Sequence, residues 1–270
     1  MKKLVGFLFI LLALSTTLVF SVWLWLPTPK EIRGCITTTM YHVHLCPGSS
    51  DYVPLKQISP YMQKTVVLTE DSGFYQHHGF EWSAIEKNAR EGWETGKFKR
   101  GGSTITQQLA KNMFLSKDRT FIRKGFEALI TEEIEKNLKK SEILERYLNV
   151  VEFGTGIYGI KKAASFYFKK TPANLDVVES AFLAMVLPNP KIYSRSYFKQ
   201  NLTPFARHRI QQIVEGMYRY NRISSEEYQA ATDKINGFFN PAPPPSIDPT
   251  MDANLPPADD FSDLDQSNDE

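Results

Sequence analysis

The sequence predicts a mainly α-helical globular domain attached to one N-terminal transmembrane helix. Three observations support this prediction. Residues 4–26 form a run of 23 residues without a charged side chain. From residue 58 onward apolar residues recur at helical spacing. The last 30 residues are rich in acidic residues and proline. We therefore divide the chain into an N-terminus at 1–3, an anchor at 4–26, a stalk at 27–57, a globular domain at 58–240 and a disordered tail at 241–270.

The apolar run is long enough to cross a bilayer, because a helix rises 1.5 Å per residue and a hydrocarbon core is about 30 Å thick. A cleaved signal peptide usually has a shorter apolar run that ends in small residues. Here Trp23, Trp25 and Pro27 end the run instead, and tryptophan suits a membrane interface. The sequence therefore favours an uncleaved anchor. Lys2 and Lys3 precede it and predict a cytoplasmic N-terminus with the rest of the chain outside.

The net charge changes sign along the chain. The tail carries eight acidic residues and no Lys or Arg, so subtracting it from the whole-chain charge of +2 leaves +10 for residues 1–240. A basic domain suits nucleic acid, an anionic membrane surface or a pyrophosphate-bearing substrate. No nucleic-acid-binding module is recognisable, so the sequence predicts no nucleic-acid partner. A membrane-resident anionic substrate fits better.

The predicted stalk contains Cys35 and Cys46, with His42 and His44 between them. Outside the cytoplasm, two cysteines this close in sequence favour a disulfide that closes a small loop. Two free thiols remain an alternative. A zinc site is a weaker one, because the spacing matches no common zinc pattern. The stalk itself is expected to be extended, with one hairpin.

Residues 64–127 hold the candidate site. Gly101 and Gly102 permit a tight turn, and Ser103 or Thr104 can cap a helix that follows. Two stripes follow from helical spacing: an apolar stripe of Ile105, Leu109 and Met113, and a polar stripe of Thr104, Gln108, Lys111 and Asn112. A solvated face would show Glu and Lys pairs instead. The polar stripe near a helix N-terminus favours an anion.

Two carboxylates bracket this helix. A helix starting near Ser59 ends close to Glu70, which follows an apolar run, so partial desolvation should raise the pKa of Glu70 and suit it to act as a base. Arg123 and Glu127 share a face of a later helix. As an isolated surface pair they would contribute only about 0.3–0.5 kcal/mol. The core side of that helix is expected to comprise Phe126, Leu129, Ile130, Ile134 and Leu138.

Four further patterns have a structural interpretation. Residues 113–121 are amphiphilic, and either dock on the bilayer or form a buried loop with solvated charges. Residues 154–159 match GxGxxG, but a helical segment rather than a strand precedes them, so we predict a turn. Asp176 and Glu179 predict a capping box. Residues 196–199 match SxxK, but no SDN or KTG motif follows, so no transpeptidase is expected.

Four segments in order carry a family resemblance: EDSGFYQHHG at 70–79, GGSTITQQLAKN at 101–112, RKGFE at 123–127 and KKSEILERYLNVVEFGTGIYGIKKAASFYF at 139–168. They resemble the motifs of the peptidoglycan glycosyltransferases, and more specifically the monofunctional biosynthetic transglycosylases. The resemblance extends from about residue 50 to about residue 220. It implies a lysozyme-like fold for residues 58–240 and a place in the bacterial cytoplasmic (inner) membrane.

The resemblance also implies a reaction. The substrate would be lipid II, a disaccharide-pentapeptide on a polyprenyl pyrophosphate, and the growing glycan would be transferred to the 4-hydroxyl of the lipid II GlcNAc with inversion to a β-1,4 linkage. A lytic muramidase and a membrane-anchored scaffold that recruits other cell-wall enzymes through its tail are the alternatives. We expect that no cofactor is required. The sequence leaves open whether a divalent cation, Mg²⁺ or Mn²⁺, binds at the pyrophosphate.

The implied catalytic residues are Glu70, as the base, and Glu127, which would orient a basic residue or hold a divalent ion. No metal ligands are otherwise expected, and His77 is expected to hydrogen-bond around the site. The implied substrate-binding residues are Asp71, Phe74, His77, Ser103, Thr104, Gln108, Lys111, Asn112, Arg123 and Lys124.

Overall fold

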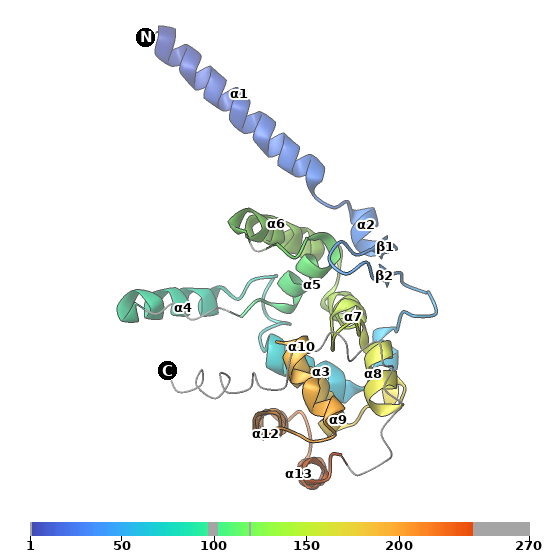
Figure 1. Cartoon of the computed structure of the whole chain (residues 1–270). Coiled ribbons are helices and arrows are strands. Elements are labelled where there is room, and N and C mark those ends of the chain that lie inside the picture. The colour runs from blue at the N-terminus through green and yellow to red at the C-terminus, as the bar shows by residue number, and fades with distance from the viewer. Residues whose placement is uncertain (1, 97–101, 119, 240–270) are drawn as a thin grey trace.

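The chain is mainly helical, as predicted. The computed structural model describes residues 2–96, 102–118 and 120–239 (Figure 1). The predicted tail at 241–270 and Gly101 of the predicted turn lie outside the described residues. In chain order the elements are α1 (Lys2–Trp25), α2 (Pro29–Arg33), β1 (Ile36–Thr37), β2 (His44–Leu45), η1 (Leu55–Gln57), α3 (Pro60–Glu70), α4 (Trp82–Thr95), α5 (Ile105–Phe114), α6 (Phe121–Asn137), α7 (Lys140–Val150), α8 (Ile160–Phe168), η2 (Pro172–Asn174), α9 (Val177–Val186), α10 (Pro190–Tyr193), α11 (Arg195–Phe198), α12 (Pro204–Arg219) and α13 (Ser225–Asn236).

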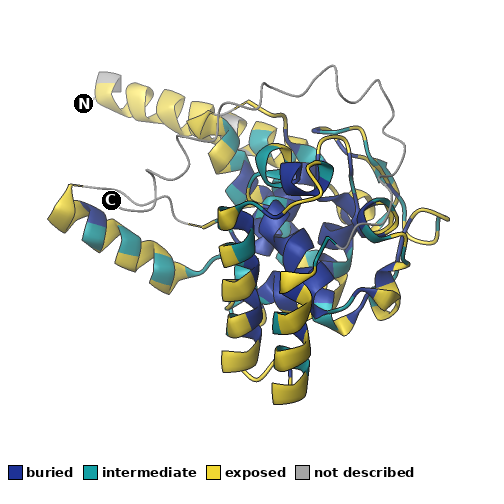
Figure 2. Cartoon of the chain, turned by 60° about the horizontal axis from the view of Figure 1, so that its bottom comes forward, coloured by how far each residue is buried: buried dark blue, intermediate teal, exposed yellow. Residues whose placement is uncertain are grey.

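Helix α1 projects from the rest of the molecule and its described apolar side chains are mostly exposed (Figures 1 and 2). It is long and apolar enough to cross a membrane. The hydroxyls of Ser15, Thr16, Thr17 and Ser21 donate to backbone carbonyls three or four residues earlier in the same helix. These four hydroxyls are thereby satisfied within the helix, as an apolar environment requires. At the end of α1, the ring centroids of Trp25 and of Phe126 in α6 lie 4.4 Å apart.

The segment 29–57 is not an extended stalk. Strands β1 and β2 pair antiparallel, and the Cys35–Cys46 disulfide closes the hairpin. Side chains in this segment, including Ile32 and Leu45, are fully buried in the same core as the later helices. The Asn149 side chain of α7 bonds both the backbone N–H and the carbonyl of Val53. These apolar and backbone contacts make the segment part of the globular body, whereas the sequence predicted that the body starts at residue 58.

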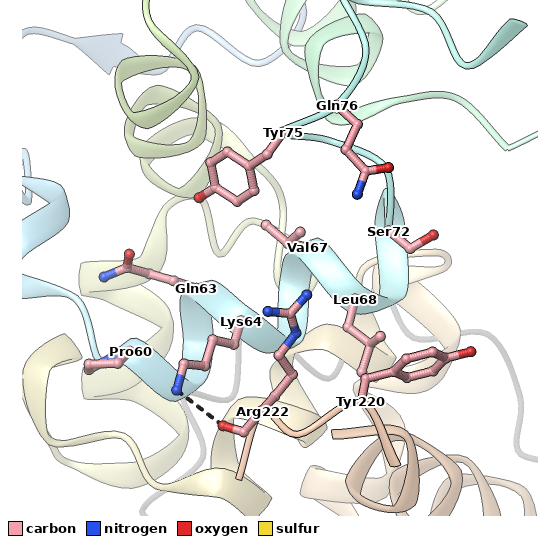
Figure 3. Close-up of a pocket in the computed structure, with 10 residues that line it drawn as sticks. All are labelled: Pro60, Gln63, Lys64, Val67, Leu68, Ser72, Tyr75, Gln76, Tyr220 and Arg222. Atoms are coloured by element: carbon pink, nitrogen blue, oxygen red, sulfur yellow. Dashed lines mark hydrogen bonds between the residues drawn. The ribbon is translucent and has the colours of Figure 1, made fainter. Parts of the chain in front are cut away.

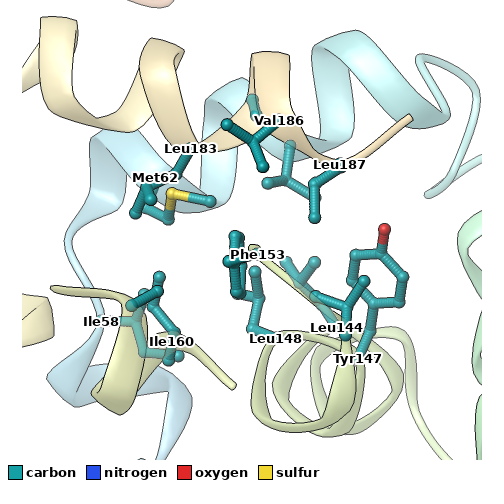
Figure 4. Close-up of a cluster of buried hydrophobic side chains, with 14 of the residues drawn as sticks. Ile58, Met62, Leu144, Tyr147, Leu148, Phe153, Ile160, Leu183, Val186 and Leu187 are labelled. Carbon is teal, nitrogen blue, oxygen red and sulfur yellow. The ribbon is translucent and has the colours of Figure 1, made fainter. Parts of the chain in front are cut away.

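The core lies where α3, α7 and α9 meet. Figure 4 shows side chains from these helices and from the flanking segments pointing into one cluster. Every residue of α9 is buried, because α3 and α12 cover it. The core cluster includes Ile58, Met62, Leu144, Tyr147, Leu148, Phe153, Ile160, Leu183, Val186 and Leu187. Most of the predicted core side of α6 is buried as well, but Leu129 is 39% exposed. It lies away from the stripe of Ile130 and Ile134.

The helix boundaries follow the predicted caps. Ser59 caps α3 before Pro60, and Asp176 and Glu179 form the capping box of α9. The GxGxxG segment is a turn, as predicted, since it follows α7 and leads into α8. At its last glycine, Gly159, φ is +80° and a Cβ would lie 2.6 Å from the Asn149 carbonyl oxygen. Only glycine fits there without strain.

Candidate functional site

The first carboxylate of the site, Glu70, lies at the end of α3 against the polar side of α5. The Gln108 side-chain amide donates to Glu70 Oε2 at 2.9 Å, and the buried Tyr147 hydroxyl donates to Gln108 Oε1 at 3.0 Å. The Tyr147 bond fixes which end of the Gln108 amide faces Glu70. Burial raises the pKa of Glu70, and the Gln108 hydrogen bond and the positive charges of Arg209 and Lys111 oppose that rise.

The loop after α3 holds the start of α5. Asp71 accepts from the Ile105 backbone N–H at 3.0 Å through one oxygen and contacts His77 Nε2 at 2.8 Å through the other. Thr104 caps α5 in a capping box with Gln107, and its hydroxyl donates to the Gly79 carbonyl at 2.7 Å. These bonds fix the N-terminus of α5, and so the direction of its polar stripe.

The second carboxylate, Glu127 on α6, is buried and bound by two cations. Arg123 Nη1 donates to Glu127 Oε2 at 3.0 Å, and the Lys124 ammonium donates to Oε1. Lys124 also lies 3.4 Å from the Ser103 hydroxyl. The Arg123 side chain is largely buried, and its Nε has no hydrogen-bond partner among the described residues. A buried cation with an unused donor suggests an anionic ligand.

A continuous path of hydrogen bonds joins the two carboxylates. Gln108 bonds Glu70 and also donates to the Ser103 carbonyl at 3.3 Å, and Ser103 in turn contacts Lys124, which bonds Glu127. Burial lowers the pKa of the nearby Lys111, while the Glu127 carboxylate raises it and the charges of Arg123 and Lys124 lower it further. The site is therefore one electrostatic unit with a carboxylate at one end and a cation cluster at the other.

Several predicted site residues come together and others do not. The hydrogen-bonded path contains Glu70, Ser103, Gln108, Lys124, Arg123 and Glu127. The charges of Glu127, Arg123 and Lys124 also act on Lys111. Asn112 lies on the same helix as Lys111 and is only 4% exposed. The remaining predicted site residues, Asp71, Phe74, His77 and Thr104, make contacts inside the protein. Among them, His77 hydrogen-bonds Asp71, in line with the hydrogen-bonding role expected of it.

Phe74 is the most deeply packed of these residues. Its ring is fully buried and the Lys140 ammonium lies 4.6 Å from its centroid, so the ring is not available to a substrate. The side-chain oxygens of Asp71 and Thr104 take part in the hydrogen bonds to Ile105, His77 and Gly79 described above. We assign these residues a positioning role, since they hold the loop and α5 in place.

Sequence reasoning missed two residues near Glu70. Tyr147 lies at an apolar position of α7, and apolar periodicity gives no signal for the hydrogen bond that its hydroxyl makes. Arg209 lies on α12, far from Glu70 in sequence, yet its charge acts on the Glu70 carboxyl. The SxxK match is not a site, since Ser196 is 3% exposed in the short helix α11. Among the described residues, no three His, Cys, Asp or Glu side chains cluster as metal ligands.

The chain resembles known proteins over most of its globular part. The family model described as Transglycosylase matches residues 39–218. A biosynthetic peptidoglycan transglycosylase of Herminiimonas arsenicoxydans is 47% identical over 142 residues, which is 53% of this chain and 62% of that protein. The protein of the same description from Methylobacillus flagellatus is 40% identical over 172 residues, 64% of this chain and 73% of that protein.

A third protein of that description, from Acinetobacter baylyi, is 38% identical over 194 residues, 69% of this chain and 86% of that protein. A crystal structure of penicillin-binding protein 1A from Haemophilus influenzae gives a TM-score of 0.28 at 26% identity. This match covers 47% of this chain and 15% of that one. The chain spans less than two thirds of the Herminiimonas protein but most of the Acinetobacter protein. Because the family model covers well over half of the sequence, this chain belongs to the transglycosylase family.

Proposed function

We propose that this protein polymerises the glycan strands of peptidoglycan from lipid II. The observation that carries the proposal is the hydrogen-bonded path from Glu70 to the cations on α6. The reaction needs a base at the acceptor sugar and positive charge at the departing pyrophosphate. The path supplies both within one site. Family membership supports the same reaction.

Glu70 is the proposed general base. A sugar hydroxyl is a poor nucleophile at neutral pH, so a carboxylate must accept its proton as the 4-hydroxyl attacks the anomeric carbon of the growing chain. Burial strengthens Glu70 as a base, and the Gln108 hydrogen bond and the nearby positive charges keep it ionised. The amide of Gln108 also fixes one oxygen, which leaves Oε1 for the acceptor hydroxyl.

The cations are proposed to stabilise the pyrophosphate as it leaves. Lys111, Arg123 and Lys124 supply charge, and the Ser103 hydroxyl and Asn112 supply further hydrogen bonds. The Arg123 Nε–H that has no partner among the described residues is a donor ready for a phosphate oxygen. Because the base and the cations lie at opposite ends of the path, attack and departure from opposite sides of the sugar, with inversion, fit this arrangement.

Glu127 is proposed to orient the basic residues. Both of its oxygens already accept hydrogen bonds from Arg123 and Lys124. The other role considered, holding a divalent cation against the pyrophosphate, fits less well, because the ion would have to displace these two side chains. We therefore assign no step of the reaction to a metal ion held by Glu127.

The membrane end of the molecule is proposed to lie beside α6. Phe121 and Ile122, at the start of α6, are 99% and 75% exposed, and α6 contacts the end of α1 through Phe126 and Trp25. With a cytoplasmic N-terminus, α1 would hold the site at the outer face of the bacterial cytoplasmic membrane, where a lipid-linked substrate lies. Protease treatment of intact spheroplasts tests this orientation, since it should digest the helical domain.

The function is tested by incubating the purified full-length protein in detergent with fluorescent lipid II and separating the products by length. A ladder of polymer that is sensitive to a known muramidase is the expected result. Shortening of preformed glycan without new polymer would favour the lytic alternative. No reaction with either substrate, together with loss of cell-wall recruitment on deletion of residues 241–270, would favour the scaffold.

A further inference from the structure

A pocket of about 650 Å³ lies between α3, the loop after it and the end of α12 (Figure 3). None of the residues assigned above to catalysis or to pyrophosphate binding lines it. Its place on α3 relative to Glu70 and the chemistry of its lining indicate which ligand it can bind.

The pocket adjoins Glu70 along one face of α3. Gln63 and Val67 line the pocket, and Glu70 follows them at i+7 and i+3, so the three side chains lie in a row on the helix. At the far end of this row the chain continues into Ser72 and Tyr75, which also line the pocket. A ligand whose sugar lies at Glu70 therefore has the pocket as its neighbour.

The lining is basic and rich in hydrogen-bonding groups. Lys64 and Arg222 bring two positive charges, and none of the described lining residues is acidic. The Lys64 ammonium donates to the Arg222 carbonyl at 3.1 Å, which ties the two together, and Figure 3 shows the Arg222 guanidinium directed over α3. Gln63 and Gln76 add amide groups. Such a set matches carboxylates and peptide groups.

Two exposed rings complete the pocket. Tyr75 is 60% exposed and Tyr220 is 61% exposed. The Tyr75 ring packs edge-on against buried Phe74, with centroids 5.0 Å apart, so the ring is anchored although its outer face is free. A neutral glycan would use the rings but would not need two cations. A polyprenyl chain would need neither the cations nor the amides.

We propose that this pocket binds the peptide of the sugar-peptide substrate through a peptide carboxylate held by Arg222 and Lys64. The inference rests on the proposed function for the identity of the sugar at Glu70. It adds a specificity site for the acidic peptide, separate from the cations on α6 that face the pyrophosphate.

The test measures binding by calorimetry to the full-length Glu70→Gln protein in detergent, which separates binding from catalysis. One probe is the free disaccharide-pentapeptide; the other is the same disaccharide with its peptide removed and the freed carboxyl capped as an amide. We expect Arg222→Gln to weaken binding of the first probe about tenfold, the loss of one charge-assisted contact, and to leave the second unchanged. Lys64→Gln should act in the same direction and Lys64→Arg should restore binding.

Lys136→Gln is the matched control, because Lys136 is an exposed lysine of α6 paired with Glu133. It should bind both probes like the parent. Equal weakening of both probes by Arg222→Gln, or no weakening of either in protein that unfolds at the parental temperature, overturns the inference. Displacement of the first probe by inorganic pyrophosphate, lost in Arg222→Gln, overturns it as well, since the pocket would then be a phosphate site.

The binding result is independent of polymerisation. If the wild-type protein makes no polymer but the first probe binds in an Arg222-dependent way, the pocket assignment stands and the polymerase assignment fails. If polymer forms while Arg222→Gln binds both probes normally, the polymerase assignment stands and the pocket assignment fails.

Discussion

The Gln108 side-chain amide donates a hydrogen bond of 2.9 Å to the Glu70 carboxylate, across the contact between α5 and the end of α3. This bond favours the ionised form of Glu70, whereas burial favours the protonated form. The Tyr147 hydroxyl holds the amide in this orientation. The protonation state of Glu70, the proposed base, therefore depends on Gln108 and on the Tyr147 hydroxyl that orients it.

Replacing Gln108 should shift the pH dependence of polymerisation. In Gln108→Leu the Glu70 carboxylate loses its donor, so the pKa of Glu70 rises further and the ionised base is lost at a higher pH. The acidic limb of the kcat/KM profile should therefore move to higher pH. A hydrogen bond to a charged group contributes about 1.5–3 kcal/mol, so activity on that limb should fall at least tenfold. The exposed Gln229→Leu serves as the control, and an unmoved limb in Gln108→Leu would contradict the role given to Gln108.

Replacing Glu127 should affect the alkaline limb of the kcat/KM profile. Glu127→Gln removes the carboxylate that raises the pKa of Lys111, while the charges of Arg123 and Lys124 remain and lower it. The Lys111 ammonium is then lost at a lower pH, so the alkaline limb should move to lower pH.

The same change should destabilise the fold by about 1–3 kcal/mol, below the figure for a fully buried pair because Lys124 is 48% exposed. Thermal unfolding measures this effect, at about 2–4 °C per kcal/mol. Glu133→Gln, which breaks a partly exposed pair with Lys136, should change neither quantity. An alkaline limb that stays in place would argue against coupling between Glu127 and Lys111.

Asp71 should behave as a positioning residue. In Asp71→Ala the buried Ile105 N–H and His77 lose their acceptor, which costs about 1–3 kcal/mol. In Asp71→Asn the amide oxygen still accepts from Ile105 and the amide nitrogen can donate to neutral His77, so the cost should be much smaller. Hydrogen exchange at the first turn of α5 reports the difference. If both variants lose polymerisation activity equally while hydrogen exchange stays unchanged, the Asp71 charge would act on the substrate instead.

The Cys35–Cys46 disulfide should stabilise the globular body. Closing a loop of this length contributes about 3 kcal/mol in the chain-entropy description. The hairpin it closes is tied to the end of α5 by a bond of 3.0 Å from the Thr39 N–H to the Met113 carbonyl. Reduction should therefore lower the unfolding temperature by about 6–12 °C. A Cys35→Ala, Cys46→Ala protein should already unfold at that lower temperature and show no response to reductant.

The helical body could be predicted from local signals. Ser59 with Pro60, Thr104, and Asp176 with Glu179 all cap the helices that the sequence predicts, because capping depends on residues within one turn. The segment 27–57 could not be predicted in the same way. Its burial depends on contacts with α6 and α7, such as those of Ile32 and of Asn149 with Val53, and these are distant in sequence.

The site, too, could be predicted only in part from the sequence. The order of motifs predicted that Glu70, Gln108 and Glu127 lie together, and the structure joins them by hydrogen bonds. Motif order does not separate residues that face a ligand from residues that hold the site together. Phe74 and Asp71 carry the motif and yet are buried, which only the packing around α5 reveals.

The most direct test of the central claim is a comparison of wild type with Glu70→Gln on fluorescent lipid II, with substrate binding measured on the same samples. The substitution keeps the size of the side chain and removes the base. We predict that Glu70→Gln binds lipid II about as tightly as wild type and forms no polymer at any pH. Polymer formed by Glu70→Gln at a rate near that of wild type would contradict the assignment of Glu70 as the base.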